Sequence, residues 1–183
     1  MANRKFLNLN EIELLLNAIP QNKNMERDRC MILMCFIHGL RVTELRRLRL
    51  QDVDFENNCL YVSRLKNGFS VQHPLQVRER QALSLWLAQR PQYLGVDSDL
   101  LFLSKHGGEL SRQHLHRLMR HYGELAGLDV PVHPHMLRHA CGYALADKGT
   151  DTRLIQDYLG HRNIQNTVIY TASNVQRFRS IDI

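Results

Sequence analysis

Residues 25–45 read MERDRCMILMCFIHGLRVTEL, and this stretch says most about the fold. The part that ends at His38 is apolar on every side, which predicts a helix at the centre of the core. Gly39 then suits the left-handed backbone conformation that ends a helix. Arg41 follows at the start of a short helix that is expected to run to about Leu48, so the chain is predicted to fold around this segment.

The other helices are predicted from apolar residues at helical spacing and from capping residues at their ends. They are expected at 8–20, 78–89, 111–126, 134–148 and 152–159, with a last helix from about 163 that carries Tyr170. The helix capped by Ser111 is expected to bury Leu115, Leu118, Met119, Tyr122 and Leu125. Most of the chain is therefore predicted to be helical.

A short sheet is predicted between these helices. Two strand-like runs, 59–63 and 69–75, flank Asn67-Gly68, a dipeptide typical of hairpin turns. Residues 53–55 are expected to add a third strand, and Pro74 places the end of the second hairpin strand there or puts that strand at an edge. The predicted fold class is mainly α with a small antiparallel β-sheet (α+β), and the 183 residues are expected to form a single domain.

Basic residues exceed acidic ones, and they are clustered. The formal net charge is +6 at pH 7. Arg41, Arg46, Arg47 and Arg49 fall within nine residues, and Arg112, Arg117 and Arg120 within another nine. Such clusters are typical of a surface that faces phosphates. Arg46, Arg47, Arg112 and Arg117 are therefore candidate DNA-binding residues.

Other features of the sequence bear on the location of the protein. The longest apolar run, 31–37, is too short for a bilayer, which needs about 20 residues. No N-terminal segment has the regions of a signal peptide. The four cysteines include no C-x-x-C pair and are expected to be reduced and buried. A cytoplasmic protein without a membrane partner is expected.

A set of chemically reactive residues follows in one order along the chain. It comprises GLRVTEL at 39–45, Lys66 in the predicted hairpin, HMLRH at 135–139, LGH at 159–161 and Tyr170, nine residues after His161. A nucleophile that attacks a phosphodiester builds negative charge on the non-bridging oxygens. Arginine meets that charge with a planar fork of donors that stays protonated. His135 and Arg138 are three residues apart on a predicted helix and so share a face.

In this order and at these spacings the motifs resemble the catalytic domain of the tyrosine recombinases. That class includes the phage integrases, the Xer recombinases and the fimbrial-switch invertases, and the sequence is most similar to the short invertases. The resemblance covers nearly the whole chain, from about Leu7 to Tyr170. Each motif alone is common, but the ordered set is specific. The resemblance implies a catalytic-domain fold over 1–183, and we expect no separate N-terminal core-binding domain.

The resemblance also implies roles for the motif residues. Tyr170 would attack the phosphorus, form a 3′-phosphotyrosine and free a 5′ hydroxyl. Arg41 and Arg138 match the family's two arginines, and Lys66 matches its general acid for the departing 5′ oxygen, with Arg64 as a nearby competitor.

The remaining motif residues are expected to assist these groups. His135 would relay the Tyr170 proton or bind the phosphate, and His161 would donate a hydrogen bond to the phosphate. Glu44 would orient the site by bonding to a neighbour. His139 is expected to be structural or to support another residue of the site.

A metal site is the rival interpretation of the histidines. His114 with His116, and His133 with His135, could ligate zinc, yet no cysteine or carboxylate cluster accompanies them at ligand spacing. His114 and His116 also point to opposite faces of the predicted helix. We therefore expect neither a metal nor another cofactor.

The predicted function is site-specific DNA recombination, most similar to the inversion of a promoter-bearing segment that switches fimbrial or surface genes. Two alternatives stay open: a type IB topoisomerase, and a DNA-binding regulator with an inactive site. The expected partners are double-stranded DNA with short inverted-repeat sites, three further copies of the chain in a homotetramer on synapsed DNA, and DNA-bending accessory proteins. The expected location is the cytoplasm, at the nucleoid.

Overall fold

The computed structural model describes residues 4–63 and 70–172 of the chain. Within these ranges the helices are α1 (Leu9–Asn17), α2 (Met25–Ile37), α3 (Val42–Arg46), α4 (Val77–Gln89), α5 (Arg112–Leu125), α6 (Pro134–Asp147), α7 (Thr152–Leu159) and α8 (Gln165–Ala172). Two short 3-10 turns, Leu50–Asp52 and Arg90–Gln92, lie between them. The strands are β1 (Val53–Asp54), β2 (Cys59–Val62) and β3 (Val71–Pro74). The predicted class, mainly α with a small antiparallel sheet, is confirmed.

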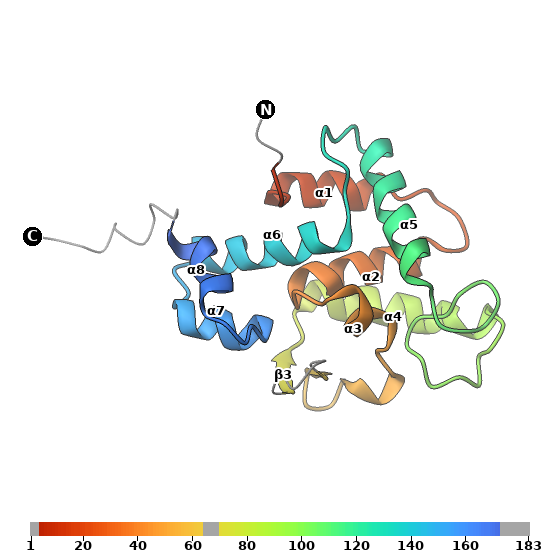
Figure 1. Cartoon of the computed structure of the whole chain (residues 1–183). Helices are drawn as coiled ribbons and strands as arrows, with labels where there is room; N and C mark the ends of the chain where they lie inside the picture. The colour runs from red at the N-terminus through yellow and green to blue at the C-terminus, as the bar shows by residue number, and fades with distance from the viewer. Residues whose placement is uncertain (1–3, 64–69, 173–183) are drawn as a thin grey trace, which may run out of the picture.

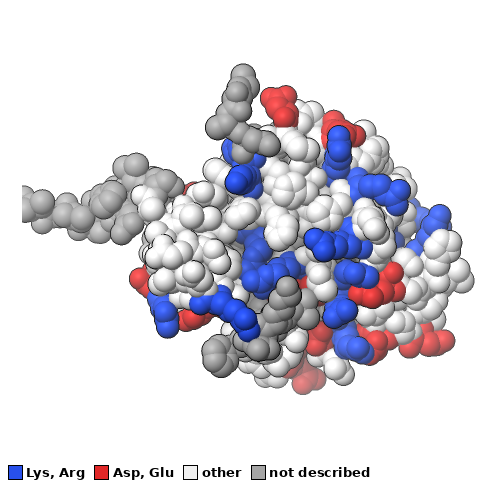
Figure 2. All heavy atoms as spheres, viewed as in Figure 1, with Lys and Arg blue, Asp and Glu red and all other residues white. Residues whose placement is uncertain are grey.

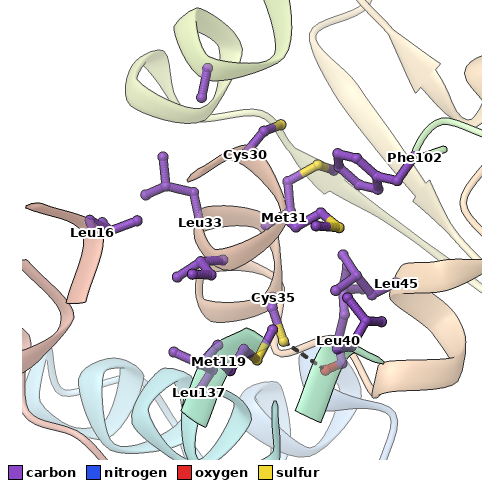
Figure 3. Close-up of a cluster of buried hydrophobic side chains, with 14 of the residues drawn as sticks. Leu16, Cys30, Met31, Leu33, Cys35, Leu40, Leu45, Phe102, Met119 and Leu137 are labelled. Atoms are coloured by element: carbon purple, nitrogen blue, oxygen red, sulfur yellow. Dashed lines mark hydrogen bonds between the residues drawn. The ribbon is translucent and has the colours of Figure 1, made fainter. Parts of the chain in front are cut away.

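Helix α2 lies at the centre of the molecule, as its all-round apolar sequence predicts (Figure 1). It packs against α4 on one side and α6 on another, and α3 follows it directly. Its side chains Cys30, Met31 and Cys35 are fully buried, and Phe102 and several leucines of neighbouring elements surround them (Figure 3). The Cys35 thiol donates to the carbonyl of Leu40, 3.4 Å away, which fixes the turn after α2.

The helix ends are set by the expected capping residues. Asn8 accepts a hydrogen bond from the backbone N–H of Glu11, and the Glu11 carboxylate accepts one from the backbone N–H of Asn8, which is the reciprocal capping box. Ser111 caps α5 by accepting from the backbone N–H of His114. Gly39 ends α2 at a φ of +56°, and a side chain there would also collide with Leu159.

Two predictions about the core are wrong, because Cys59 is only partly buried and Leu125 lies at the surface. Leu125 is 51% exposed, although Leu115 and Met119 on the same helix are fully buried. At about 100° per residue, Leu125 lies on the same margin of the apolar stripe as Leu118, which is only half-buried. The last turn of α5 therefore presents its leucine to the surface.

The three strands form one antiparallel sheet in the order β1-β2-β3. Leu60 pairs with His73 and Val62 with Val71, so the buried side chains of β2 alternate with the exposed Tyr61. Strand β3 lies at the edge and ends at Pro74, as the missing N–H of proline predicts. The predicted turn at Asn67-Gly68 lies outside the described residues.

Helices α6, α7 and α8 form the end of the molecule that carries the reactive residues (Figure 1). They pack against one another, and α6 also contacts α2 and α5. Gly160 ends α7 in the left-handed conformation, with a φ of 65°. The ends of α2 and α7 therefore meet beside α6, and this junction holds the site described next.

Candidate active site

The two predicted arginines are held by backbone carbonyls at the junction of α2 and α7. Nη1 of Arg138 donates to the carbonyl of Gly39, and its Nη2 donates to the carbonyl of Leu159 at 2.6 Å. Nη2 of Arg41 donates to the carbonyl of Gly160 at 3.2 Å. Because carbonyls at helix ends lack partners within their helix, they can take these guanidinium donors. The spacing of the two arginines is thus set by the backbone.

Glu44 fixes Arg41 from the other side. One carboxylate oxygen accepts from Nη1 of Arg41 at 2.8 Å, and the other accepts from the Arg41 backbone N–H at 2.8 Å. Glu44 is 4% exposed, so water has little access to the carboxylate of this ion pair. The neighbour that the sequence left unnamed for Glu44 is therefore Arg41.

Tyr170 lies on α8 with its ring enclosed by aromatic neighbours. The ring makes an edge contact with Tyr143, with centroids 5.1 Å apart, and a stacked contact with His161 at 6.2 Å. Burial raises the pKa of the Tyr170 hydroxyl to about 12, although the Arg138 charge opposes that rise. The side chain is only 1% exposed. The hydroxyl is therefore protonated near neutral pH and requires a base before it can act as a nucleophile.

His139, not His135, contacts the Tyr170 hydroxyl. Nδ1 of His139 lies 2.9 Å from the hydroxyl oxygen, within hydrogen-bond distance. Burial lowers the pKa of His139, and the nearby charges of His135 and Arg138 add to this effect. A histidine with a lowered pKa is neutral near pH 7 and can accept the phenolic proton. The sequence pattern assigned this contact to His135 and a structural part to His139.

Helix geometry brings His139 to the same pocket as His135 and Arg138. Residues 135, 138 and 139 share one face of α6, because they are three and four positions apart. The crossing of α8 over α6 decides which histidine reaches Tyr170, and that is a tertiary feature. His135 lines the same pocket with part of its side chain exposed, and its pKa is lowered by partial desolvation and by the nearby positive charges of His133 and Arg138. A phosphate contact of His135 stays a prediction.

His161 is positioned by Thr167, a residue that the sequence analysis missed. Nδ1 of His161 lies 2.9 Å from the Thr167 hydroxyl, and Thr167 is fully buried on α8. With Nδ1 engaged in this way, Nε2 is the ring nitrogen that suits a hydrogen bond to a ligand. Thr167 lies three residues before Tyr170, one turn earlier on the same helix, so α8 places both the tyrosine and the partner of His161.

These residues share one pocket of about 290 Å³. Its lining is Arg41, His135, Arg138, His139, His161, Gln165, Asn166, Ile169 and Tyr170. Five of the six predicted catalytic residues are thus brought together from segments far apart in the sequence. The sixth, Lys66, and its competitor Arg64 lie outside the described residues.

The predicted DNA-binding arginines lie on two neighbouring surfaces. Nε of Arg46 donates to the carbonyl of Leu110 at 2.7 Å and lies 3.1 Å from Glu109, so this side chain also ties α3 to the segment before α5. Arg47, Arg112 and Arg117 are exposed. Figure 2 shows that Lys and Arg atoms gather across the middle of one face, whereas Asp and Glu atoms lie mainly toward its margins.

The histidine pairs of the rival metal interpretation do not form a metal cluster in the described part of the chain. No group of three or more His, Cys, Asp and Glu residues there could hold a metal ion. The rings of His116 and His133 are stacked with centroids 6.3 Å apart. Desolvation lowers the pKa of both.

Among the described helices, none is long and apolar enough to span a membrane.

Comparison with known proteins connects this geometry to a family. Residues 5–177 match the model of the phage integrase family. The chain is 52% identical over 178 residues to the type 1 fimbriae regulatory protein FimB of Escherichia coli K12, with 97% of this chain and 89% of that protein covered. It is 47% identical over 182 residues to FimE of the same strain, covering 99% and 92%.

Solved structures agree with the sequence relatives. The crystal structure of the XerA recombinase superposes with a TM-score of 0.82 at 28% identity, over 95% of this chain and 62% of that one. The XerH site-specific recombinase in its pre-cleavage complex with difH gives a TM-score of 0.78 at 29% identity, over 92% and 50%. The chain thus spans half to two-thirds of the length of these two recombinases. Its match to the family model and to FimB and FimE shows that it belongs to the phage integrase family, as a tyrosine recombinase.

Proposed function

We propose that this protein cleaves and rejoins duplex DNA at a specific site through a covalent 3′-phosphotyrosine on Tyr170. One observation carries the proposal: the Tyr170 hydroxyl is bonded to a histidine in a pocket that also holds two arginines fixed by helix-end carbonyls. The proposal assigns to these groups the roles of a nucleophile, a base and two oxyanion stabilisers, and their shared pocket supports it. Four residues of its lining, His135, Gln165, Asn166 and Ile169, are exposed to solvent.

The first step breaks one phosphodiester bond and forms another. The Tyr170 oxygen attacks the phosphorus, its proton passes to Nδ1 of His139, and the bond from phosphorus to the 5′ oxygen breaks. At a pKa of about 12 only about one tyrosine in 100,000 is ionised near pH 7, so a base within 2.9 Å removes a large part of the barrier. Arg41 and Arg138 offset the charge that develops on the two non-bridging oxygens.

The departing 5′ oxygen needs a proton, because an alkoxide is a poor leaving group. We assign that proton to Lys66, from the family pattern and from its place before β3 in the chain. The freed 5′ hydroxyl of a partner strand then attacks the phosphotyrosine and releases Tyr170. The phosphate stays esterified throughout, so rejoining needs no external energy source.

The relatives FimB and FimE favour a specific biological role. Both are named as regulators of type 1 fimbriae, and the chain matches them over nearly its full length at about half identity. We propose that this protein inverts a promoter-bearing segment between short inverted repeats and so switches fimbrial or related surface genes. Inversion requires four strand exchanges, which fits a homotetramer on two synapsed sites, aided by DNA-bending proteins at the nucleoid.

The test is covalent capture on a nicked site that loses its short 5′ fragment after cleavage. Tyr170→Phe should bind this DNA like the unaltered protein and form no covalent complex, because the ring stays and the nucleophile is gone. Tyr143→Phe is the matched control, since it alters the tyrosine that packs on Tyr170. Covalent capture by Tyr170→Phe would disprove the mechanism.

The outcome on closed circular DNA separates the alternatives. A type IB topoisomerase would relax supercoils without any specific site, whereas a recombinase should invert a segment only between two sites. A regulator with an inactive site would bind and form no covalent complex.

A further inference from the structure

The short segment before α1, residues 4–7, lies beside α6 and is not part of the mechanism above (Figure 1). Leu7 is 1% exposed and belongs to the main apolar core. Phe6 is half-buried, and its ring contacts the ring of Tyr143 on α6, with centroids 4.0 Å apart. A segment that carries none of the reactive residues is therefore packed against the helix on which Tyr170 rests.

Three aromatic rings connect this segment to the nucleophile. The planes of Phe6 and Tyr143 are tilted by 33°. Tyr143 in turn makes the edge contact with Tyr170, with centroids 5.1 Å apart and planes at 80°. Aromatic pairs favour such tilted and edge-to-face arrangements, so each ring restricts the positions that the next ring can take. The contact of Phe6 is thus transmitted to Tyr170 through one intervening ring.

Phe6 is itself held by its neighbours in the sequence. The guanidinium of Arg4 lies over the Phe6 ring, 5.9 Å from the centroid, which is a cation–π distance. Nη2 of Arg4 also donates to the carboxylate of Glu11. Glu11 in turn accepts from the backbone N–H of Asn8 in the capping box of α1. Because the core fixes Leu7 and the helix cap fixes the partner of Arg4, the position of Phe6 is set from both sides.

The segment joins the main core to the smaller apolar cluster that contains Tyr170. Leu7 belongs to the main core, whereas Tyr143 packs against the second cluster, of which Tyr170 is a member. A region with few buried apolar contacts opens more readily than the main core. The contact between Phe6 and Tyr143 therefore ties the less extensive cluster to the more extensive one.

The charge of this segment also acts on the pocket. Burial lowers the pKa of His139, and the positive charges of His135, Arg138 and Lys5 are among those that add to this effect. The neutral form of His139 is the one that can accept the phenolic proton of Tyr170. The segment thus lies near enough to influence both the nucleophile and the histidine that bonds to it.

We propose that residues 4–7 brace the nucleophile: Phe6, acting through the ring of Tyr143, is a positioning residue that keeps the Tyr170 hydroxyl at His139. This inference rests on the proposed function for its effect on cleavage, whereas the brace itself is a property of the fold. The contacts run through the rings, so Tyr143→Phe retains them. Removal of the Phe6 ring should let Tyr143 and then Tyr170 shift, and a shift of a reacting atom by about 1 Å costs on the order of 100-fold in rate.

The decisive variant is Phe6→Ala, and Phe55→Ala is its matched control. Phe55 is also half-buried against the main core and also has an arginine over its ring, Arg80 at 5.3 Å, but it does not line the pocket around Tyr170. Single-turnover cleavage of a nicked site is measured per folded molecule, with DNA binding followed in parallel. The rate should fall on the order of 10- to 100-fold in Phe6→Ala and stay within about threefold of the unaltered protein in Phe55→Ala. DNA affinity should change little in either variant.

A second measurement follows the position of Tyr170 without DNA. N-acetylimidazole acylates the hydroxyl oxygen of accessible tyrosines, and mass spectrometry locates the label. Tyr170 is 1% exposed, and burial raises its pKa to about 12, so it should react slowly in the unaltered protein. It should react severalfold faster in Phe6→Ala, because a loosened ring gains contact with water, and remain slow in Phe55→Ala. Phe6→Tyr restores the ring and should restore both slow labelling and fast cleavage.

The labelling assay separates failure of this inference from failure of the proposed function. If Tyr170→Phe still forms a covalent complex with DNA, Tyr170 is not the nucleophile, and the labelling rates decide the brace alone. Equal labelling of Tyr170 in Phe6→Ala and Phe55→Ala overturns the inference. If Tyr170→Phe is inactive, cleavage by Phe6→Ala within about threefold of the unaltered protein, or an equal loss in Phe55→Ala, overturns it as well.

Discussion

Gly142 is the residue whose substitution should separate stability from catalysis. It lies inside α6, where a β-carbon would meet Cε2 and Cζ of Tyr170 at 2.6 Å. Ordinary contact begins near 3.4 Å, so the ring must retreat by about 0.8 Å in Gly142→Ala. The helix itself would gain about 0.5–1 kcal/mol from alanine, while overpacking costs about 1–3 kcal/mol. The free energy of unfolding should therefore fall by no more than about 2.5 kcal/mol.

The catalytic effect should be seen in the molecules that remain folded. A displacement close to 1 Å moves the Tyr170 oxygen relative to His139 and the arginines, and such shifts cost on the order of 100-fold in rate. Covalent cleavage of a nicked site would be measured in a single turnover, with thermal unfolding and DNA binding followed in parallel. DNA affinity should change little, since the pocket keeps its charged side chains.

Gly123→Ala is a matched control. Gly123 lies inside α5, and its β-carbon would meet a methyl group of Val132 at 2.5 Å, so the strain is similar but remote from Tyr170. This variant should lose stability and keep cleavage per folded molecule. A cleavage rate of Gly142→Ala within about threefold of that of the unaltered protein would refute the reasoning. It would mean that the exact position of the Tyr170 ring does not limit the rate. An equal loss in folded Gly123→Ala would also refute it.

Two predictions concern the groups around Tyr170. Arg41→Lys keeps the positive charge, but a lysine lacks the planar fork that lets one side chain bond to Glu44, Gly160 and a phosphate at once. The rate of single-turnover cleavage should therefore fall about 100-fold. A loss of rate below about threefold would contradict this prediction. Because the pKa of His139 is lowered from 6.5, its accepting form persists into mild acid, and the acidic limb of the cleavage rate against pH should lie below pH 6.5. A limb above that value, or one that is unchanged in His139→Gln, would remove His139 from the proton path.

Much of the fold follows from local sequence signals. The capping box of Asn8 and Glu11, the apolar sequence of α2, and the glycines after α2 and α7 each act within a few residues. Pro74 marks the edge strand for the same kind of local reason. Leu125 departs from its predicted burial. It lies at the margin of the apolar stripe of α5, where burial depends on tertiary packing and not on the local sequence.

The chemistry of the site was also predictable, because a phosphodiester restricts the useful side chains. Arginines, histidines and one tyrosine in a fixed order lead to the pocket that the structure forms from the residue before α3, from α6, from the turn after α7 and from α8. The supporting contacts were not predictable in this way. Arg46, predicted to bind DNA, is held by the carbonyl of Leu110, and Thr167 bonds to His161 across a turn. Neither contact leaves a pattern that a single sequence would reveal.

The assignment of the histidines shows where sequence reasoning reaches its limit. Residues 135, 138 and 139 share one face of α6, so periodicity brings all three to the pocket but cannot rank them. The ranking comes from α8, which crosses α6 close enough for Tyr170 to touch Gly142 and to place its hydroxyl 2.9 Å from His139. A side chain at 142 would push the Tyr170 ring away from α6 and so disturb the contact between its hydroxyl and His139. The absence of a side chain at Gly142 thus permits the contact between Tyr170 and His139, although no chemical argument from the sequence would have singled that residue out.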